Sequence, residues 1–181
     1  MSERIPRLAM QDLSPALGDA LRPRVERLGY LGEFFRCAAN APEALLAFHR
    51  FTEALKEALP MRATEVIALT VATRLGNAYE RHQHEQLCRR SGWSAEWVRA
   101  VEALQPTDLH DDGERAVQRL VLAVLHHQGH GVQAELDAVT DALGAAGTVA
   151  VLFSIGRYVT HSLMVNALAL EPPVASIFPP E

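Results

Sequence analysis

The sequence predicts an all-α fold of six to eight helices. Apolar residues recur every three or four positions, and prolines and helix-capping residues bound the segments in which they do so. No segment alternates with period two beside an Asn-Gly or Asp-Gly turn, so no sheet is expected. The chain has 181 residues, 49% of them hydrophobic. This predicts a single domain over residues 1–181 with a substantial core.

The predicted elements follow one another along the chain. Residues 1–24 are mixed and turn-rich, and we expect an N-terminal arm that wraps a neighbouring subunit or the body of the protein. Residues 62–75 are apolar almost all round, which is typical of a helix buried on several sides. The other predicted helices cover residues 42–59, 78–90, 94–103, about 111–128, about 132–143 and 145–170.

Charge and cysteine content exclude several classes of protein. Seventeen Lys and Arg against 22 Asp and Glu give a net charge of −5, which argues against nucleic-acid binding. Cys37 and Cys88 form no CxxC pair, so we expect neither a disulfide framework nor a thiolate zinc cluster. The polar N-terminus shows no secretory signal, and a cytoplasmic location is expected. Residues 148–170 are long enough to span a bilayer, but Arg157 lies in their middle, which favours a buried helix and no membrane partner.

The candidate chemistry lies between residues 65 and 84. Glu80 and His84 are four residues apart on a predicted helix and can touch. A carboxylate beside an imidazole raises the pKa of the imidazole and fixes its tautomer, which suits an acid or base. Glu65 and Arg157 interrupt apolar helices, so each is expected to have a charged partner.

Residues 65–85, EVIALTVATRLGNAYERHQHE, resemble the signature of the carboxymuconolactone decarboxylase family, which also contains the alkylhydroperoxidase AhpD. In that family a glutamate on an R-x-x-E-x-[VI] helix is followed, twelve residues on, by C-x-x-C-x-x-x-H. Arg62, Glu65 and His84 match this pattern, whereas Asn77 and Glu80 stand where the two cysteines would be. The resemblance extends loosely over nearly the whole chain.

The resemblance implies a reaction without redox chemistry. AhpD-type peroxidase activity needs a thiolate and a resolving thiol, and both are missing at the motif positions. The family's cysteine-free decarboxylases act on a small lactone carboxylate by protonation, with no metal or organic cofactor. By analogy, His84 would be the acid or base, Glu80 its orienting carboxylate and Glu65 a second proton-transfer group or anchor. The substrate-binding residues would be Asn77, Tyr79 and Arg157.

Other interpretations stay open at this stage. Glu80 and His84 could be an ordinary surface pair, and Cys88 an inert buried thiol. A metal site could use Glu65, Glu80 and His84, with a second histidine cluster formed by His126, His127 and His130, although E-x-x-x-H supplies only two ligands. The chain could also be a ligand-binding or assembly protein without redox cysteines. Family members form trimers or hexamers, so a homo-oligomer is expected, whether trimer, hexamer or dimer.

Overall fold

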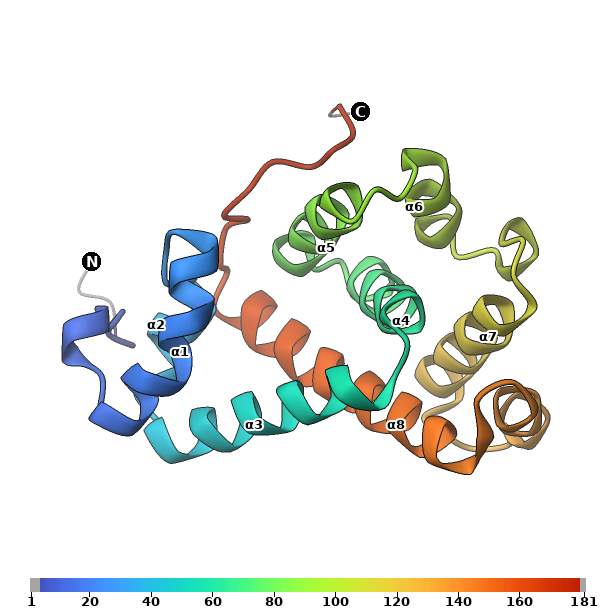
Figure 1. Cartoon of the computed structure of the whole chain (residues 1–181), viewed down its shortest axis with the longest axis horizontal. Coiled ribbons are helices and arrows are strands. Elements are labelled where there is room, and N and C mark those ends of the chain that lie inside the picture. The colour runs from blue at the N-terminus through green and yellow to red at the C-terminus, as the bar shows by residue number, and fades with distance from the viewer. Residues whose placement is uncertain (1–3, 180–181) are drawn as a thin grey trace. The chain divides into compact units, whose positions relative to one another are not determined.

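The structure is a computed structural model that describes residues 4–179, and it is all-α (Figure 1). Over the described residues it has eight α-helices, no strand and 73% helix, which confirms the predicted fold class. The α-helices are α1 (Pro15–Leu28), α2 (Glu33–Ala38), α3 (Pro42–Ala58), α4 (Met61–Arg74), α5 (Ala78–Arg90), α6 (Ala95–Glu102), α7 (Asp112–His127) and α8 (Gln133–Ala167).

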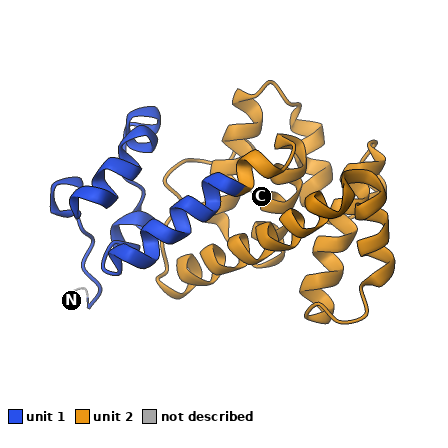
Figure 2. Ribbon diagram, turned by 60° about the horizontal axis from the view of Figure 1, so that its bottom comes forward, with its two compact units in different colours: residues 1–54 blue, residues 55–181 orange. Residues whose placement is uncertain are grey.

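The chain divides into two compact units, residues 1–54 and residues 55–181, with the boundary inside α3 (Figure 2). In the first unit, Leu17 and Leu21 of α1 and Phe34 of α2 are almost fully buried. The turn-rich interpretation of residues 1–24 missed α1. Pro15 opens this helix, where a proline is favourable because the first-turn N–H needs no helical partner.

Helix α4 lies at the centre of the second unit, where it contacts α5, α6, α7 and α8. Its residues from Val66 to Ala72 are all buried, although they point to every side of the helix. This explains why the sequence of α4 is apolar almost all round. Glu65, in the first half of α4, is a buried charged residue that is only 2% exposed and needs a partner.

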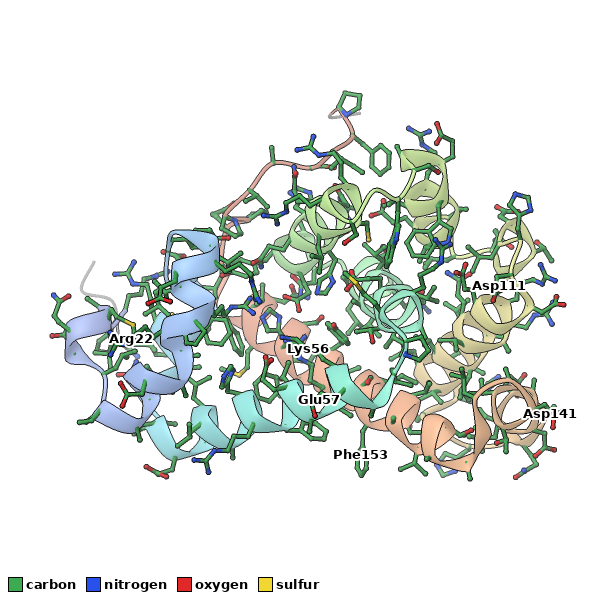
Figure 3. The ribbon with its side chains drawn as sticks, viewed as in Figure 1. Arg22, Lys56, Glu57, Asp111, Asp141 and Phe153 are labelled. Carbon is green, nitrogen blue, oxygen red and sulfur yellow. The ribbon has the colours of Figure 1, made fainter. Side chains whose placement is uncertain are left out.

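Side-chain caps fix where three helices of this unit begin. The side-chain oxygens of Asn77, Ser94 and Asp111 accept a hydrogen bond from the backbone N–H three residues on, which starts α5, α6 and α7. Figure 3 labels Asp111 at the start of α7. The cap at Asn77 matters most for the site, because it sets the register in which α5 presents Glu80 and His84.

Helix α8 is two helices joined across a kink. Gly144 has φ +70° and ψ 173°, a conformation that is essentially restricted to glycine. The sequence-based break between residues 143 and 145 therefore coincides with the kink. The helix is long and apolar enough to cross a membrane by length and composition alone. It also carries the buried polar residues Arg157 and His161.

Candidate functional site

Three helices of the second unit bring five charged or titratable side chains together: Glu65 from α4, Glu80 and His84 from α5, and Arg157 and His161 from α8. We call these five residues the buried cluster. The side chain of His84 is 14% exposed, and those of Glu65, Glu80 and Arg157 are between 3% and 8% exposed. An ion-pair network of this kind forms only when α4, α5 and α8 pack against one another.

His84 lies between two carboxylates. Its Nδ1 is 2.6 Å from Glu65 Oε2, and its Nε2 is 3.4 Å from Glu80 Oε1. Burial lowers the pKa of His84, but the negative charge and hydrogen bonds of Glu65 and Glu80 outweigh it and raise the pKa to about 9. At neutral pH the ring is therefore an imidazolium that donates from Nδ1 to Glu65 and forms an ion pair through Nε2 with Glu80.

Glu80 is held mainly by two partners on α8, Arg157 and His161. Its Oε1 accepts a hydrogen bond of 2.8 Å from Arg157, and its Oε2 lies 3.2 Å from His161 Nδ1. Burial acts to raise the pKa of Glu80, yet His161, Arg157 and the hydrogen bond from His84 together hold it well below the usual carboxyl range. The same carboxylate raises the pKa of the Arg157 guanidinium against its burial. These partners on α5 and α8 thus hold Glu80 as an anion.

The predicted contact between Glu80 and His84 is present, and the expected partners of Glu65 and Arg157 are His84 and Glu80. The roles of the two carboxylates differ from those that the family resemblance implies, in which Glu80 orients His84. Glu65 makes the short hydrogen bond to His84, whereas Glu80 lies farther from His84, as an ion pair, and accepts its hydrogen bond from Arg157. Glu65 therefore orients the imidazole in this geometry.

Of the predicted substrate-binding residues, Arg157 belongs to the buried cluster, whereas Asn77 and Tyr79 lie beside it. The Asn77 side chain caps α5 through its oxygen, and its Nδ2 donates to Ser162 Oγ at 3.0 Å, so both ends of the amide are engaged within the protein. Tyr79 is buried, with its ring centroid 6.0 Å from that of His161. Arg157 contacts Glu80, and its guanidinium carbon lies 4.2 Å above the ring of Tyr158.

Sequence reasoning did not assign His161 and Tyr158 to the site. The ring of Tyr158 packs edge-on against His84, with 5.4 Å between centroids. A signal was present, because Arg157 and His161 are four residues apart in an otherwise apolar helix and therefore share one face. Two polar side chains on one face of a buried helix indicate a common buried partner.

Cys88 is fully buried, and its thiol donates to Glu65 Oε2 over 3.6 Å. Burial and the negative charge of Glu65 both raise the pKa of this thiol above its usual value. The site therefore disfavours a thiolate, which fits the interpretation of Cys88 as an inert buried residue.

Neither alternative metal cluster has the arrangement of a metal site among the described residues. Among residues 4–179, no group of three or more His, Cys, Asp and Glu side chains has an arrangement that could hold a metal ion. His126, His127 and His130 are exposed near the end of α7.

Residues 42–123 match the carboxymuconolactone decarboxylase family. This segment contains the motif residues Glu65, Asn77, Glu80 and His84. Over this segment the chain resembles the carboxymuconolactone decarboxylase/AhpD-like family. It differs from the family's redox motif in that Asn77 and Glu80 occupy the cysteine positions.

Solved structures agree with this fold. The debrominase Bmp8 has a TM-score of 0.80 at 17% identity, covering 95% of this chain and 93% of its own. An AhpD-core, peroxidase-related protein from Ralstonia eutropha has a TM-score of 0.80 at 15% identity, covering 94% of each chain. A putative antioxidant defence protein AhpD from Agrobacterium tumefaciens has a TM-score of 0.69 at 21% identity, covering 76% of this chain and 96% of its own. A search of the curated proteins finds no sequence match.

Proposed function

We propose that this protein catalyses cofactor-independent proton transfer, of the decarboxylation type, on a small organic acid or lactone. The observation that carries the proposal is His84, an imidazolium held between Glu65 and Glu80 with its edge partly exposed. A buried cation with two hydrogen-bonded carboxylates is an oriented general acid. The name of the family supplies the substrate class.

The two ring nitrogens of His84 differ in how firmly their protons are held. Nδ1–H is bound to Glu65 at 2.6 Å, whereas Nε2–H faces Glu80 at 3.4 Å. We infer that Nε2–H is the proton that is transferred. When the bond between carbon and the leaving carboxylate breaks, its electron pair remains as an enolate, and this proton adds to the enolate carbon. Carbon dioxide leaves, and His84 regains a proton from water.

The neighbouring ion pair supports this role for His84. Because Arg157 and His161 hold Glu80 as an anion, Glu80 can stabilise the imidazolium without taking its proton. Glu65 keeps the ring oriented during the transfer. Thiol-based peroxide reduction is not proposed, because Cys88 is held as a thiol and the motif positions lack sulfur.

Replacing His84 with glutamine tests the proposal. With 4-carboxymuconolactone as the probe, we expect the wild type to release carbon dioxide and His84→Gln to lose at least about 100-fold in kcat, because the general acid is gone. The activity of the wild type should fall as the pH rises through about 9, where His84 loses its proton. The rate is followed by carbon dioxide release, with circular dichroism to check folding.

His82→Gln is the matched control, since His82 lies on the same helix and its Nδ1 contacts the carbonyl of Val174 instead of the cluster. We expect it to retain activity within about twofold, as for a residue outside the reacting groups. Absence of turnover by the wild type, or equal rates for His84→Gln and His82→Gln, would contradict the proposal.

The second candidate is a ligand-binding or assembly protein. One observation favours it: the cavity described below does not include Glu65, Glu80 or His84 in its lining. In addition, α8 exposes the apolar side chains of Val149, Phe153 and Leu163, which would suit a homo-oligomeric interface. Figure 3 shows the ring of Phe153 projecting from α8. This candidate gains support if the wild type sediments as a trimer or hexamer and leaves the lactone unchanged.

The family neighbours add a ligand for comparison. A cysteine-to-alanine variant of the debrominase Bmp8 was solved in complex with 2,3,4-tribromopyrrole, a small halogenated heterocycle. That ligand supports the proposal that this fold accepts a small organic molecule in this chain as well.

A further inference from the structure

A cavity of about 1260 Å³ lies in the second unit, and its lining includes none of the five residues of the buried cluster. Pockets that bind small organic molecules usually measure about 300–1,000 Å³, so this one has room for such a ligand. Its polar lining comes from three helices: Thr73 of α4, Arg81 and Glu85 of α5, and Arg99 and Glu102 of α6.

The segment that follows α8 forms another wall of this cavity. Figure 1 shows the chain leaving α8 and running past α5 before it ends. We call residues 174–178 the C-terminal strap, and most of it lines the cavity. Side chains of α5 hold its backbone: His82 Nδ1 lies 3.2 Å from the carbonyl oxygen of Val174, and Gln86 donates to that of Ala175 at 2.9 Å.

Glu85 is the fully buried carboxylate of the lining. Its Oε2 accepts from the Ser176 hydroxyl and, at 2.8 Å, from the backbone N–H of Ile177, so the orientation of the carboxylate is fixed. Its Oε1 lies 3.4 Å from Arg81 Nε, but the two atoms form no hydrogen bond. Both atoms are buried, and neither has a hydrogen-bond partner among the described residues. An acceptor and a donor that each lack a hydrogen bond therefore lie side by side.

Two further polar atoms of the lining are in the same state. Thr73 Oγ1 and Glu102 Oε1 are buried, and within the described part of the chain they have no hydrogen-bond partner. Leaving a buried polar group without a partner lowers stability, and a bound ligand can supply the partner. Burial, followed by the charge of Glu85, also raises the pKa of Glu102 to about 8. A cationic group bound in the cavity would act in the opposite direction.

We propose that this cavity binds an α-amino acid with an apolar side chain, as the free zwitterion. The carboxylate of the amino acid accepts from Arg81 Nε, and its ammonium group donates to Glu85 Oε1. In an α-amino acid these two groups share one carbon atom, which suits a donor and an acceptor only 3.4 Å apart. Both bonds join charged groups, and such bonds are stronger than those between neutral groups. The proposal does not depend on the chemistry proposed for His84.

The apolar part of the lining accounts for the side chain of the ligand. Ala78, Ala103, Ile177 and Phe178 contribute apolar surface to the cavity. An aliphatic or aromatic side chain that leaves water for this surface stabilises the complex in proportion to the area it buries. Affinity is therefore expected to rise from glycine to L-leucine and L-phenylalanine.

Calorimetric titration of the full chain with L-phenylalanine tests the proposal. We expect saturable binding with a Kd of about 1 mM or lower, and binding of glycine at least about tenfold weaker. Hydrocinnamate lacks the ammonium group and phenethylamine lacks the carboxylate. Each should bind at least about tenfold more weakly than L-phenylalanine, because each leaves one of the two buried atoms without a partner. The NMR signal of the Ile177 amide, which donates to Glu85, should shift on binding.

Arg81→Met removes the proposed partner of the carboxylate. It should weaken binding of L-phenylalanine at least about tenfold and that of phenethylamine by less than about threefold, since phenethylamine has no carboxylate. Arg89→Met is the matched control: it removes an exposed arginine from the same helix and should bind L-phenylalanine within about twofold of the wild type.

If Arg81→Met does not fold, the comparison of L-phenylalanine, hydrocinnamate and phenethylamine on the wild type decides. Three results would each overturn the proposal: no binding of L-phenylalanine at about 10 mM, equal affinities for L-phenylalanine and phenethylamine, or undiminished binding by folded Arg81→Met. Shifts confined to residues around His84, with the Ile177 amide unmoved, would also overturn it. Turnover of the lactone is measured separately, so failure here leaves the proposal for His84 to its own test.

Discussion

Arg157 is the residue on which the charge balance of the buried cluster depends most. It is 7% exposed and donates to Glu80, a carboxylate that is itself 4% exposed. Removing one partner of a buried ion pair leaves an uncompensated charge in a medium that solvates it poorly. Arg157 therefore stabilises the fold as well as the anionic state of Glu80.

Replacing Arg157 with methionine is expected to lower the free energy of unfolding by about 3–5 kcal/mol, since Glu80 would stay buried without its guanidinium partner. The measurement is denaturant unfolding at pH 7. Arg89→Met is the matched control, because Arg89 is exposed on α5, and it should change stability by no more than about 0.5 kcal/mol. A loss of less than about 1 kcal/mol in Arg157→Met would show that Glu80 does not need this partner.

The sequence shows the local part of this cluster more clearly than the long-range part. The contact between Glu80 and His84 follows from helical spacing alone, because the two residues are four positions apart. The contact between Glu80 and His161 joins positions 81 residues apart, which helical spacing cannot reveal. The hydrogen bond from His84 to Glu65 depends on how α4 and α5 pack. The sequence therefore could not show that Glu65, and not Glu80, makes the shorter contact with His84.

At the scale of elements, the sequence is most informative where capping chemistry is strong. Ser94 and Asp111 are capping residues that predict the starts of α6 and α7, because each side chain satisfies a backbone N–H that the helix leaves unpaired. At Asn77 the sequence indicates only a break between two helices, and the structure shows that its side chain caps α5. Helix α1, in contrast, was not predicted from the sequence. Its N-terminal Ser14 makes no side-chain cap, and Pro23 lies inside the helix, so its sequence looks like a series of turns.

The C-terminal strap is an element that periodicity could not find. It has no regular structure, and its binding to α5 depends on single side chains, Glu85 above all. Glu85 is buried, but the sequence of α5 around it is polar and includes the exposed residues Arg89 and Arg90. The sequence pattern therefore does not indicate that Glu85 is buried. Only the tertiary structure shows that a backbone segment from the far end of the chain covers it.

At the scale of the whole molecule, the raised pKa of His84 links stability to pH. The unfolded state has an ordinary histidine pKa of 6.5, and the folded state one of about 9. The stabilising contribution of His84 is thus complete below pH 6.5 and is lost as the pH rises through 9. The shift corresponds to about 3 kcal/mol over this window.

We therefore expect the unfolding free energy of the wild type to fall by about 3 kcal/mol more between pH 6.5 and 9 than that of His84→Gln. Glu102 also contributes in part of this range, since its raised pKa lowers stability between 4.5 and 8, but it does so equally in both proteins. Urea unfolding at a series of pH values measures the difference. Parallel profiles for the two proteins would show that His84 has no raised pKa.

In the proposed mechanism, His84 is a cationic proton donor held between Glu65 and Glu80. NMR titration of the His84 ring in the folded protein tests it most directly, with His82 as an internal comparison on the same helix. We expect an imidazolium that titrates near pH 9. In Glu65→Gln the pKa of His84 should fall toward 6.5, because the shorter of its two carboxylate contacts has lost its charge. A His84 pKa at or below 6.5 in the wild type would contradict it.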